Sequence, residues 1–537
     1  MSLRGTGQGG TFSRALEVLE VLGSAGFLHP GRMLALGAAT KKWGPTPAAG
    51  FAASASRRPD AVAIIDDDGQ VTYAELDRRT NAIANGLAAA GVRAGHGVGL
   101  FARNHIGFVE ATIALGKLGA DTLLLNTGFA APQLSEVLER EGVDVVVYDE
   151  EFAKVVDAGG GGRHRVVSYG SNDGHPTLDD LVKNNSDAEP VPPSRHGRTT
   201  ILTSGTTGTP KGAQRSARSA GLDSLVGIMG RMPLVAEQIN FVVAPTFHSW
   251  GGAHLLMASL ASCTVVLRRR FDPEDTLATI DREQPYAMAV VPVMMQRILQ
   301  LPPEVIRKYD CSSVRVVGAS GSALPGELAV RWMDTFGDNL HNFYGSTEVA
   351  TASIAMPDEL RAVPGTAGRP PRGVVVRIID ENGKKVPTGT VGRIFVGNDA
   401  QFEGYTGGGN KEVVDGLMSS GDVGHFDENG LLFVDGRDDD MIISGGENVF
   451  PREVEDLLAD HPAIEEASVI GVPDDEFGQR LKGFVVVKSG ESVTEADLKA
   501  HVKTHLARYK IPREIVFLDA LPRNPTGKVL KRVLAES

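Results

Sequence analysis

From residue 59 onward, short apolar runs alternate with longer stretches that repeat apolar side chains at helical spacing. The short runs are rich in Val, Ile and Leu, which is typical of buried strands. In the first longer stretch Leu76, Ile83 and Leu87 share one helical face, and Thr72 with Glu75 forms a capping-box pattern at its start. Strands that take turns with helices indicate parallel βαβ units. The predicted strands are 61–65, 98–102, 121–125 and 143–148, and the predicted helices are 72–87, 108–118 and 132–141.

The same alternation continues in the middle of the chain, and several predicted strands there end in small or aromatic residues. Such strand ends are typical of a ligand crevice at the carboxyl edge of a parallel sheet. The segments that follow the strands are 245–251, 318–321 and 344–348. The strands themselves are predicted at 240–244, 264–267, 287–291, 314–317 and 340–343.

The alternation breaks near residue 363, where short strands separated by Asn-Gly turns predict a small β-barrel. Residues 436–440 are charged and lack apolar side chains, which favours a hinge. A compact α+β segment closes the chain and is large enough to form its own domain. In the barrel, strands are predicted at 374–379, 392–396 and 431–434; in the last segment, helices at 451–459 and 494–506 and strands at 466–471 and 483–488.

These patterns predict an α/β protein in three parts. A chain of 537 residues is too long for one ordinary core. We expect a helical N-terminal extension over residues 1–58, and a large domain of parallel βαβ sheets plus the small β-barrel over residues 59–438. Residues 439–537 are expected to form a small, mobile α+β domain.

The N-terminal extension shows two helical patterns, one from Ser13 and one over residues 33–39. We favour a packed helical hairpin. The alternative is an amphipathic contact with a membrane or with a second subunit. The subunit contact would make the protein a homodimer.

Composition excludes several classes of protein. The net charge is −13 and no Lys/Arg tract stands out, which argues against nucleic acid as a partner. The two cysteines, Cys263 and Cys311, give neither a disulfide framework nor a metal spacing, so a reducing compartment is expected. No apolar run approaches the roughly 18 residues of a spanning helix, and no signal-peptide pattern is visible at the N-terminus. We therefore expect a cytoplasmic protein.

The most informative stretch is 202–212, Leu-Thr-Ser-Gly-Thr-Thr-Gly-Thr-Pro-Lys-Gly. Its glycines let backbone N–H groups converge on an anion, its hydroxyls add donors, and Lys211 adds a positive charge. These donors and this charge suit a polyphosphate. A Walker loop is excluded, because Pro210 stands where that pattern needs its second Gly. A flexible Ser/Thr/Gly linker is the alternative.

This stretch resembles the phosphate loop of the adenylate-forming superfamily, which includes acyl-CoA synthetases, firefly-type luciferases and peptide-synthetase adenylation domains. Later segments resemble the same family in the same order, from about Pro59 to Lys531. The closest likeness is to actinobacterial fatty acyl-CoA synthetases. The resemblance implies ATP, Mg²⁺ and coenzyme A as cofactor, metal and co-substrate.

Within residues 344–348, the resemblance implies that Tyr344 stacks on adenine, Thr347 contacts the α-phosphate and Glu348 binds Mg²⁺. A carboxylate beside a polyphosphate repels it unless a divalent cation lies between them. An exposed glutamate at a helix start is the alternative. Glu348 and Thr206 are the expected metal ligands. The expected ATP-binding set is Thr203, Ser204, Gly205, Thr206, Thr207, Gly208, Lys211, Gly318, Ala319, Ser320, Asn342, Phe343, Tyr344, Gly345, Ser346, Thr347, Asp422, Val434, Arg437 and Lys528.

By the same resemblance Asp422 and Arg437 hold the ribose hydroxyls, although an Asp in a Gly turn is often only a turn residue. Asp439 stands at the position of the family's hinge. The segment after it would approach the pantetheine arm of CoA once the small domain has rotated; an ordinary turn is the alternative. The residues concerned are Ser444, Gly445, Gly446 and Glu447.

Pro525-Thr526-Gly527-Lys528 resembles the catalytic-lysine loop, in which Lys528 would bridge the acid carboxylate and the α-phosphate. A solvated tail lysine is the alternative. The expected catalytic residues are Lys528, Thr347, Glu348 and His248.

The implied reaction joins a carboxylic acid to ATP as an acyl-adenylate and then transfers the acyl group to CoA. Amino-acid-activating relatives carry an acidic residue at the acid pocket, and residues 247–250 have none, so a plain acid is expected. The expected pocket is His248, Trp250, Gly251, Val291, Gly318 and Gly321. A medium- or long-chain fatty acid is favoured. The alternatives are an aryl-acid CoA ligase, an acyl-AMP ligase that loads a carrier protein, and a silent acyl- or nucleotide-binding protein.

Overall fold

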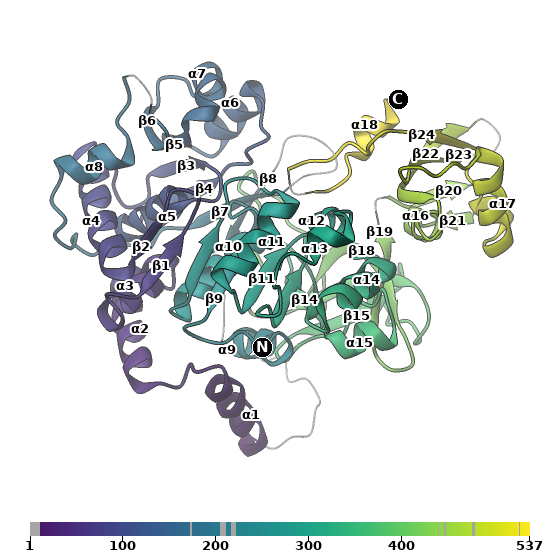
Figure 1. Ribbon diagram of the computed structural model, residues 1–537, viewed down its shortest axis with the longest axis horizontal. Helices are drawn as coiled ribbons and strands as arrows, with labels where there is room; N and C mark the ends of the chain where they lie inside the picture. Colours follow the sequence, from purple (N-terminus) through teal and green to yellow (C-terminus); the bar gives the residue numbers. More distant parts are fainter. Residues whose placement is uncertain are drawn as a thin grey trace.

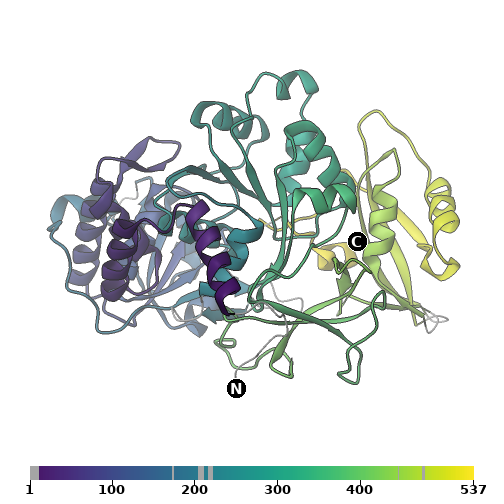
Figure 2. The same ribbon diagram turned by 90° about the horizontal axis from the view of Figure 1, so that it is seen from below.

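The computed structural model describes residues 11–171, 174–203, 211–215, 222–438, 440–444, 447–474, 478–525 and 527–536. Four sheets, A to D, organise the chain. Figure 1 and Figure 2 show sheets B and A side by side, with sheet C next to sheet A and sheet D at the far end of the molecule. The arrangement is the expected α/β architecture followed by a small α+β part.

Three helices begin the described chain, one more than the sequence predicted. They are α1 (Thr11–Ser24), α2 (Pro30–Trp43) and α3 (Pro47–Arg57). The additional helix α3 starts with Pro47 at its first position and packs against α10, α4 and α5. Trp43 and Phe51 are buried in the main core, so α2 and α3 pack on the large domain. A membrane or subunit contact of α1 and α2 stays a prediction.

Sheet B has six strands in the order β6-β5-β3-β4-β7-β8, all parallel except β8. Thr72 caps the first of its helices and accepts a hydrogen bond from the Glu75 N–H at 3.2 Å. The strands are β3 (Gly97–Phe101), β4 (Asp121–Leu124), β5 (Val143–Asp149), β6 (His164–Tyr169), β7 (Thr199–Thr203) and β8 (Lys211–Arg215). The helices are α4 (Tyr73–Ala89), α5 (Ile106–Leu118), α6 (Ala131–Arg140), the 3-10 helix η1 (Glu150–Phe152), α7 (Ala153–Gly159) and α8 (Leu178–Asn184).

Sheet A has eight strands in the order β14-β13-β12-β11-β9-β10-β1-β2. Its six central strands are parallel, so their carboxyl ends meet at one edge. The strands are β1 (Val62–Ile65), β2 (Gln70–Thr72), β9 (Ile239–Val242), β10 (Thr264–Leu267), β11 (Ala287–Val290), β12 (Val316–Ala319), β13 (Leu340–Ser346) and β14 (Ala350–Ala355). The helices are α9 (Leu222–Arg231), α10 (Ser249–Leu260), α11 (Pro273–Glu283), α12 (Pro292–Leu299), α13 (Pro303–Ile306), α14 (Gly326–Phe336) and α15 (Pro357–Ala362).

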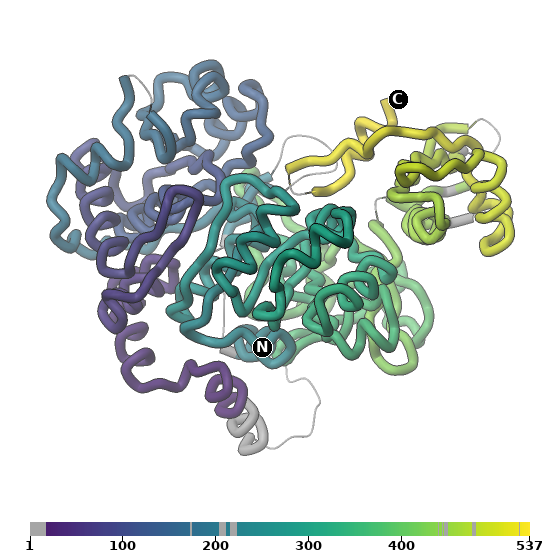
Figure 3. The backbone as a smooth tube through the Cα atoms, in the orientation of Figure 1, coloured from purple at the N-terminus to yellow at the C-terminus, as the bar shows by residue number. Residues whose placement is uncertain are grey.

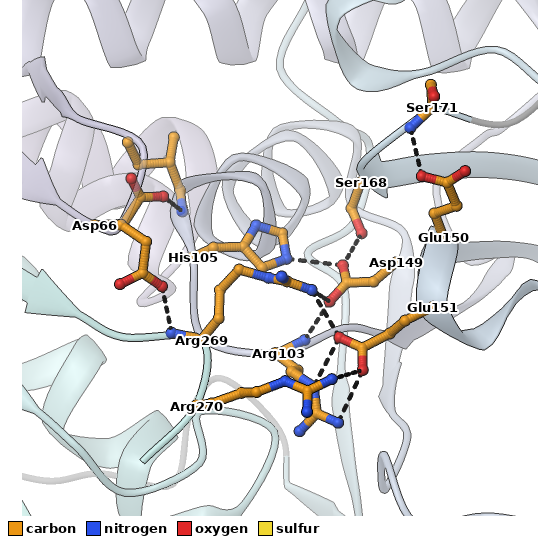
Figure 4. Close-up of polar contacts among 12 residues, drawn as sticks. Asp66, Arg103, His105, Asp149, Glu150, Glu151, Ser168, Ser171, Arg269 and Arg270 are labelled. Atoms are coloured by element: carbon orange, nitrogen blue, oxygen red, sulfur yellow. Dashed lines mark hydrogen bonds and ion pairs between the residues drawn. The ribbon is translucent and has the colours of Figure 1, made fainter. Parts of the chain in front are cut away.

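A polar cluster joins the two sheets, as Figure 4 shows. The buried carboxylate of Asp149, at the end of β5, lies 2.8 Å from His105 Nε2 and accepts a hydrogen bond from the Ser168 hydroxyl. Next to it, Glu151 accepts hydrogen bonds from three guanidinium groups, those of Arg103 from sheet B and of Arg269 and Arg270 from the end of β10. The ion pairs therefore fix the carboxyl ends of both sheets relative to each other.

Asn104 extends this junction towards the end of β9. Its side-chain amide donates to the Ala244 carbonyl at 3.0 Å, and its carbonyl oxygen accepts from the Thr246 N–H at 2.8 Å. Asn104 is buried, so each of these bonds replaces a lost bond to water. The contact holds the loop that leads to His248 and α10.

Sheets C and D complete the chain. The five-stranded antiparallel sheet C occupies the place of the predicted β-barrel, with strands β15 (Val375–Ile379), β16 (Gly392–Gly397), β17 (Val413–Val414), β18 (Leu417–Phe426) and β19 (Leu432–Arg437). Sheet D has β20 (Ile442–Ser444), β21 (Glu447–Val449), β22 (Ile464–Asp474), β23 (Gly478–Val487) and β24 (Glu514–Phe517). Its helices are α16 (Pro451–Ala459), α17 (Glu495–His505), the 3-10 helix η2 (Arg508–Lys510) and α18 (Lys531–Ala535).

The part built on sheet D has its own hydrophobic core, which includes Val454, Leu458, Val469 and Val485. In the tube of Figure 3 the C-terminal segment leaves this part, reaches back over the large domain and returns to α18. The expected hinge residue Asp439 lies outside the described residues. Across the described parts of the chain, no helix has the length and apolar character needed to cross a bilayer.

Candidate active site

One cavity of about 1820 Å³ lies where sheet A, sheet C and the C-terminal segment meet. Such a volume exceeds the roughly 300–1,000 Å³ of ordinary ligand pockets, so more than one substrate fits. Most predicted site residues within the described ranges line it. These are Lys211, His248, Trp250, Ser320, Gly321, Asn342, Phe343, Tyr344, Gly345, Ser346, Thr347, Glu348, Asp422, Val434, Arg437 and Lys528.

The structure does not describe every predicted residue. The phosphate-loop residues Ser204, Gly205, Thr206, Thr207 and Gly208 lie outside the described ranges, as do Asp439, Gly445 and Gly446, and the side chains of Thr203 and Glu447 are not described either. What is described is the base of the loop, because β7 and β8 pair as an antiparallel hairpin with Thr203 opposite Lys211.

The ring of Tyr405, in the loop between β16 and β17, contacts both Glu348 and Lys211. The Tyr405 hydroxyl donates to Glu348 Oε1 at 2.9 Å, and Lys211 Nζ lies 5.4 Å from the centre of the same ring. Residues 403–406 hydrogen-bond to β8, which places the ring there. Tyr405 was missed in the sequence, because this pairing joins segments about 190 residues apart and leaves no local pattern.

The turn after β13 presents Thr347 and Glu348 to the cavity. The Ser346 hydroxyl accepts hydrogen bonds from the N–H groups of Glu348 and Val349, each at 3.2 Å, which fixes this turn. The Thr347 hydroxyl lies 3.4 Å from that of Ser249, at the start of α10. The end of β13 and the start of α10 therefore face each other across the site.

Asp422 and Arg437 lie opposite each other on β18 and β19 and form an ion pair with a 3.2 Å contact. The Tyr344 hydroxyl donates to the other oxygen of Asp422 at 2.6 Å. Burial raises the pKa of Asp422, while the charge of Arg437 and the hydrogen bond from Tyr344 oppose the rise. A carboxylate has about four acceptor positions, so Asp422 keeps capacity for a further hydroxyl.

Lys411 is a second cation beside Asp422 that sequence reasoning missed. Gly421 has φ +79°, and a Cβ built there would lie 3.1 Å from Lys411 Nζ and 3.3 Å from Arg437 Nη2. Glycine at position 421 therefore lets two cations approach the backbone next to the carboxylate. A lone lysine in a Gly-rich loop gave no sequence signal.

A tight hairpin carries Lys528 into the cavity. The Asn524 side chain accepts a hydrogen bond from the Lys528 N–H at 2.9 Å, and the Arg523 guanidinium donates to the Gly527 carbonyl at 2.6 Å. Arg523 also forms an ion pair with Glu466 on β22, at 3.1 Å. The hairpin is thus anchored on the small domain while its tip reaches the large one.

The tip of this hairpin packs closely against the large domain. Gly527 has φ +84°, and a Cβ built there would lie 2.5 Å from Val293 Cγ1 on α12. Pro525 lies against Gly128, where a built Cβ would approach Pro525 Cγ to 2.6 Å. At position 527 only glycine combines this positive φ with so close an approach to Val293.

The charges that act on Lys528 come from the large domain. The Lys528 side chain is exposed in the open cavity, but the protein around it lowers its pKa and the charge of Arg437 lowers it further, while Asp422 and Glu348 oppose both effects. Burial and the charge of Lys528 lower the pKa of His248 to about 4, so this imidazole is neutral near pH 7. The site therefore offers cations for an anionic substrate beside a neutral histidine.

The acid pocket differs in part from its prediction. His248, Trp250 and Gly321 line the cavity, whereas Gly251, Val291 and Gly318 do not. A Cβ at Gly251 would lie 2.3 Å from the Pro245 carbonyl oxygen, so this glycine serves close backbone packing. At Gly318 a Cβ would meet the Trp250 ring at 2.9 Å, so the tryptophan fills the space that the glycine leaves. Ala319, expected at the nucleotide, and Ser444, expected at CoA, also lie outside the lining.

The donor set fits a magnesium nucleotide. Among the described residues no group of three His, Cys, Asp or Glu side chains could hold a metal ion by itself. Mg²⁺ typically takes one or two protein carboxylates and completes its shell with phosphate oxygens and water. Glu348 offers the carboxylate, and Lys211, Arg437 and Lys528 offer positive charge to phosphates along the same cavity.

Two family models match this chain. Residues 51–406 match the AMP-binding enzyme family, and residues 453–528 match the AMP-binding enzyme C-terminal domain. Glu348 lies in the first match, and Lys528 is the last residue of the second.

Curated relatives cover nearly the whole chain. The feruloyl-CoA synthase of an Amycolatopsis species is 35% identical over 481 residues, which is 88% of this chain and 95% of the relative. The fatty acid–[acyl-carrier-protein] ligase ScoC of Streptomyces coeruleorubidus is 30% identical over 504 residues, covering 90% of this chain and 94% of the relative. Among solved structures, the anthranilate CoA ligase AuaEII in complex with anthranoyl-AMP matches with a TM-score of 0.83 at 26% identity, covering 91% and 96% of the two chains.

Proposed function

The chain belongs to the AMP-binding enzyme family, an ATP-dependent group of acid-activating ligases, and from this premise we propose that it converts a medium- or long-chain fatty acid to its CoA thioester. The route is the one of an AMP-forming acid–CoA ligase. The acid and ATP give an acyl-adenylate and pyrophosphate, and CoA then displaces AMP.

The observation that carries the acid-activation half is the position of Lys528. The C-terminal hairpin brings this lysine into the cavity that Thr347, Glu348, Asp422 and Arg437 line. An acid carboxylate and a triphosphate repel each other, so their reaction needs cations that align and neutralise them. We assign this task to Lys528 and Lys211, the metal contact to Glu348, and the ribose to Asp422 with Arg437.

The acid is proposed from the wall of the cavity beyond Trp250. This part is lined by α9, the segment after it, α10 and α2. Its apolar residues include Leu36, Leu225, Ile228, Met232, Leu234, Leu255, Met257 and Leu260, beside polar side chains such as Thr40, Ser224 and His254. Burial of a methylene group contributes about 0.8 kcal/mol, so such a wall favours a long hydrocarbon portion. Residues 247–250, at the start of α10, include no acidic side chain, which fits a plain monocarboxylic acid.

An aryl acid is the second candidate. It is favoured by the relative named feruloyl-CoA synthase and by the aromatic ring of Trp250 at the entrance of the acid pocket. Flat rings pack well against such a side chain. A carrier protein in place of CoA is the alternative acceptor, because one relative is a fatty acid–[acyl-carrier-protein] ligase.

We also propose the division into an extension (1–58), a large domain (59–438) and a mobile small domain (439–537). Asp438 forms an ion pair with Arg393 on sheet C at 2.9 Å, whereas Asp440 pairs with Lys531 on α18 at 3.3 Å. Neighbouring residues are thus tied to different domains, which supports a hinge at position 439.

The test is acid-dependent release of pyrophosphate from ATP, across acetate, octanoate, palmitate, benzoate and 4-hydroxycinnamate, each with and without CoA. The proposal expects turnover with octanoate or palmitate and a CoA thioester as product. Turnover with the aryl acids alone would replace the fatty acid by the second candidate. Pyrophosphate release that CoA does not accelerate, with no thioester formed, would contradict CoA as the acceptor.

A further inference from the structure

A buried histidine stands in the otherwise apolar part of the acid pocket. His254 lies on α10, one turn beyond Trp250, and its ring meets the Trp250 ring edge-on with centroids 4.5 Å apart. It lines the cavity and is only 5% exposed. Leu225, Ile228 and Met257 on α9 and α10 line the same cavity.

The imidazole of His254 has an unsatisfied polar atom. Of the described residues that line the cavity, it is the one with a buried side-chain nitrogen or oxygen lacking a hydrogen-bond partner, and the atom is Nε2. Polar neighbours on this wall are already committed: the Thr112 hydroxyl donates to the Phe108 carbonyl at 2.8 Å, and the Thr46 hydroxyl to the Trp43 carbonyl at 3.0 Å. Because an unpaired buried polar group is costly, Nε2 favours a partner, and an acid bound in the cavity can supply one once the ring turns this buried atom towards it.

The charge state of His254 restricts that partner. Burial alone lowers the pKa of His254 to about 4, so the ring is neutral at physiological pH. In a neutral imidazole, Nε2 is either a donor or an acceptor, and the uncharged ring cannot balance the charge of a carboxylate or an ammonium group. A neutral hydroxyl or carbonyl group is the matching chemistry.

The helix sets the distance between this group and the reacting carboxylate. His248, beside Lys528, precedes the first residue of α10, and His254 follows six residues later. A rise of 1.5 Å per residue separates the two side chains by about 9 Å along the helix axis. This distance is comparable with that from the carboxyl group to the para substituent of an arylpropenoic acid, or to the far end of an eight-carbon chain.

We propose that His254 forms a polar subsite in the acid pocket that selects monocarboxylic acids with a neutral hydroxyl or carbonyl group about 9 Å from the carboxyl end. The inference rests on the proposed acid activation and narrows its substrate class. Trp250 separates the subsite from the nucleotide, since its Nε1–H donates to the Val290 carbonyl at 3.0 Å and its ring covers Gly318. The acid therefore passes along Trp250 before its far end reaches His254.

The experiment compares two matched pairs of acids, cinnamate with 4-hydroxycinnamate and octanoate with 8-hydroxyoctanoate, by kcat/KM for pyrophosphate release. In the unmodified protein the hydroxylated acid of at least one pair should exceed its parent by tenfold or more. His254→Leu should remove this advantage, mainly by raising KM for the hydroxylated acid. His254→Gln, whose amide nitrogen can occupy the position of Nε2, should restore part of it.

The control is His341→Gln, which changes an equally buried histidine on β13 that does not line the cavity. Its ratio of hydroxylated to parent acid should stay that of the unmodified protein, and thermal unfolding of each variant checks that it folds. Equal kcat/KM within both pairs in the unmodified protein would overturn the inference and leave acid activation standing. Absence of pyrophosphate release with any acid would overturn the proposed function and the inference together.

Discussion

His254 and His341 are buried histidines held in the neutral form. Burial lowers the pKa of each to about 4, from an ordinary value of 6.5. The unfolded chain therefore takes up protons between these pH values that the folded chain does not, and the free energy of unfolding falls as the pH falls through this window. The two residues make the fold sensitive to mild acid.

We predict that His341→Gln reduces this sensitivity. Between pH 7 and pH 5 one such histidine lowers the free energy of unfolding by about 2 kcal/mol, because its imidazole becomes protonated in the unfolded state only. Thermal unfolding at pH 7 and at pH 5 should show a smaller fall in Tm for the variant. A fall equal to that of the unmodified protein would show that His341 does not remain neutral when folded.

Trp250 is expected to set the size of the acid. It fills the space over Gly318, so Trp250→Ala should open the pocket towards β12 and shift kcat/KM in favour of bulkier or longer acids. The space that the removed ring leaves also lowers the free energy of unfolding, by about 3–5 kcal/mol for a buried aromatic side chain. Trp332→Ala, which changes a buried tryptophan outside the cavity, should lower Tm without shifting the preference. An unchanged acid preference in Trp250→Ala would contradict its place in the pocket.

Single residues could be predicted where they lie in a short sequence motif. Tyr344, Glu348, Asp422 and Lys528 sit in short signatures and line the cavity. His254 and Tyr405 were not predictable in this way, because each depends on a contact made only in the folded chain. The surroundings of Gly318 show the same limit: the glycine was visible in the sequence, but the Trp250 ring that covers it was not.

At the scale of elements, the hairpin around Gly527 is the most constrained piece of the site. We predict that Gly527→Ala lowers the rate of adenylate formation tenfold or more, because the methyl group meets Val293 and because φ +84° strains any other residue by about 1–3 kcal/mol. Acid-dependent pyrophosphate release measures the effect.

The matched control for Gly527→Ala is the double variant Gly527→Ala with Val293→Ala. Removing the Val293 methyl groups relieves the clash but not the backbone strain, so the double variant should recover part of the lost rate. No recovery would mean that the packing of the hairpin against α12 does not matter for the reaction.

Most elements were predictable because their apolar periodicity is strong, as in the strands of sheets A and B. The helix α3 was missed because its mostly Ala and Ser side chains offer few large apolar residues at helical spacing, and its burial against α10 is a tertiary effect. Strand order was also out of reach: β1 precedes sheet B in the chain but pairs with β10 in sheet A. Local pattern predicts a strand, whereas its partner is decided by long-range packing.

At the scale of the whole molecule, the small domain is held in a position that delivers Lys528. Gln296 on α12 and Gln300, just after its end, donate to the carbonyl and the carboxylate of Glu465, which belongs to the small domain. These contacts between the domains are polar side-chain hydrogen bonds, whereas each domain has an apolar core of its own. Such an interface favours relative domain motion.

We predict that Asp439→Pro impairs thioester formation more than adenylate formation, since proline fixes φ where the domains are expected to turn. Single-turnover measurement of the two half-reactions separates these effects, with Asp439→Ala as the control that keeps the backbone free. Unimpaired thioester formation in the proline variant would count against rotation at this position.

We propose that Lys528, delivered by the C-terminal hairpin, acts in the first half-reaction. The most direct measurement is the two half-reactions of Lys528→Ala, with adenylate formed from ATP and acid in one and thioester formed from supplied acyl-adenylate and CoA in the other. Loss of a charge contact in a closed site raises the activation free energy by roughly 3–4 kcal/mol. The assigned role of Lys528 therefore predicts that adenylate formation falls at least a hundredfold while thioester formation stays within a few fold. An equal loss in both half-reactions, or undiminished adenylate formation, would contradict it.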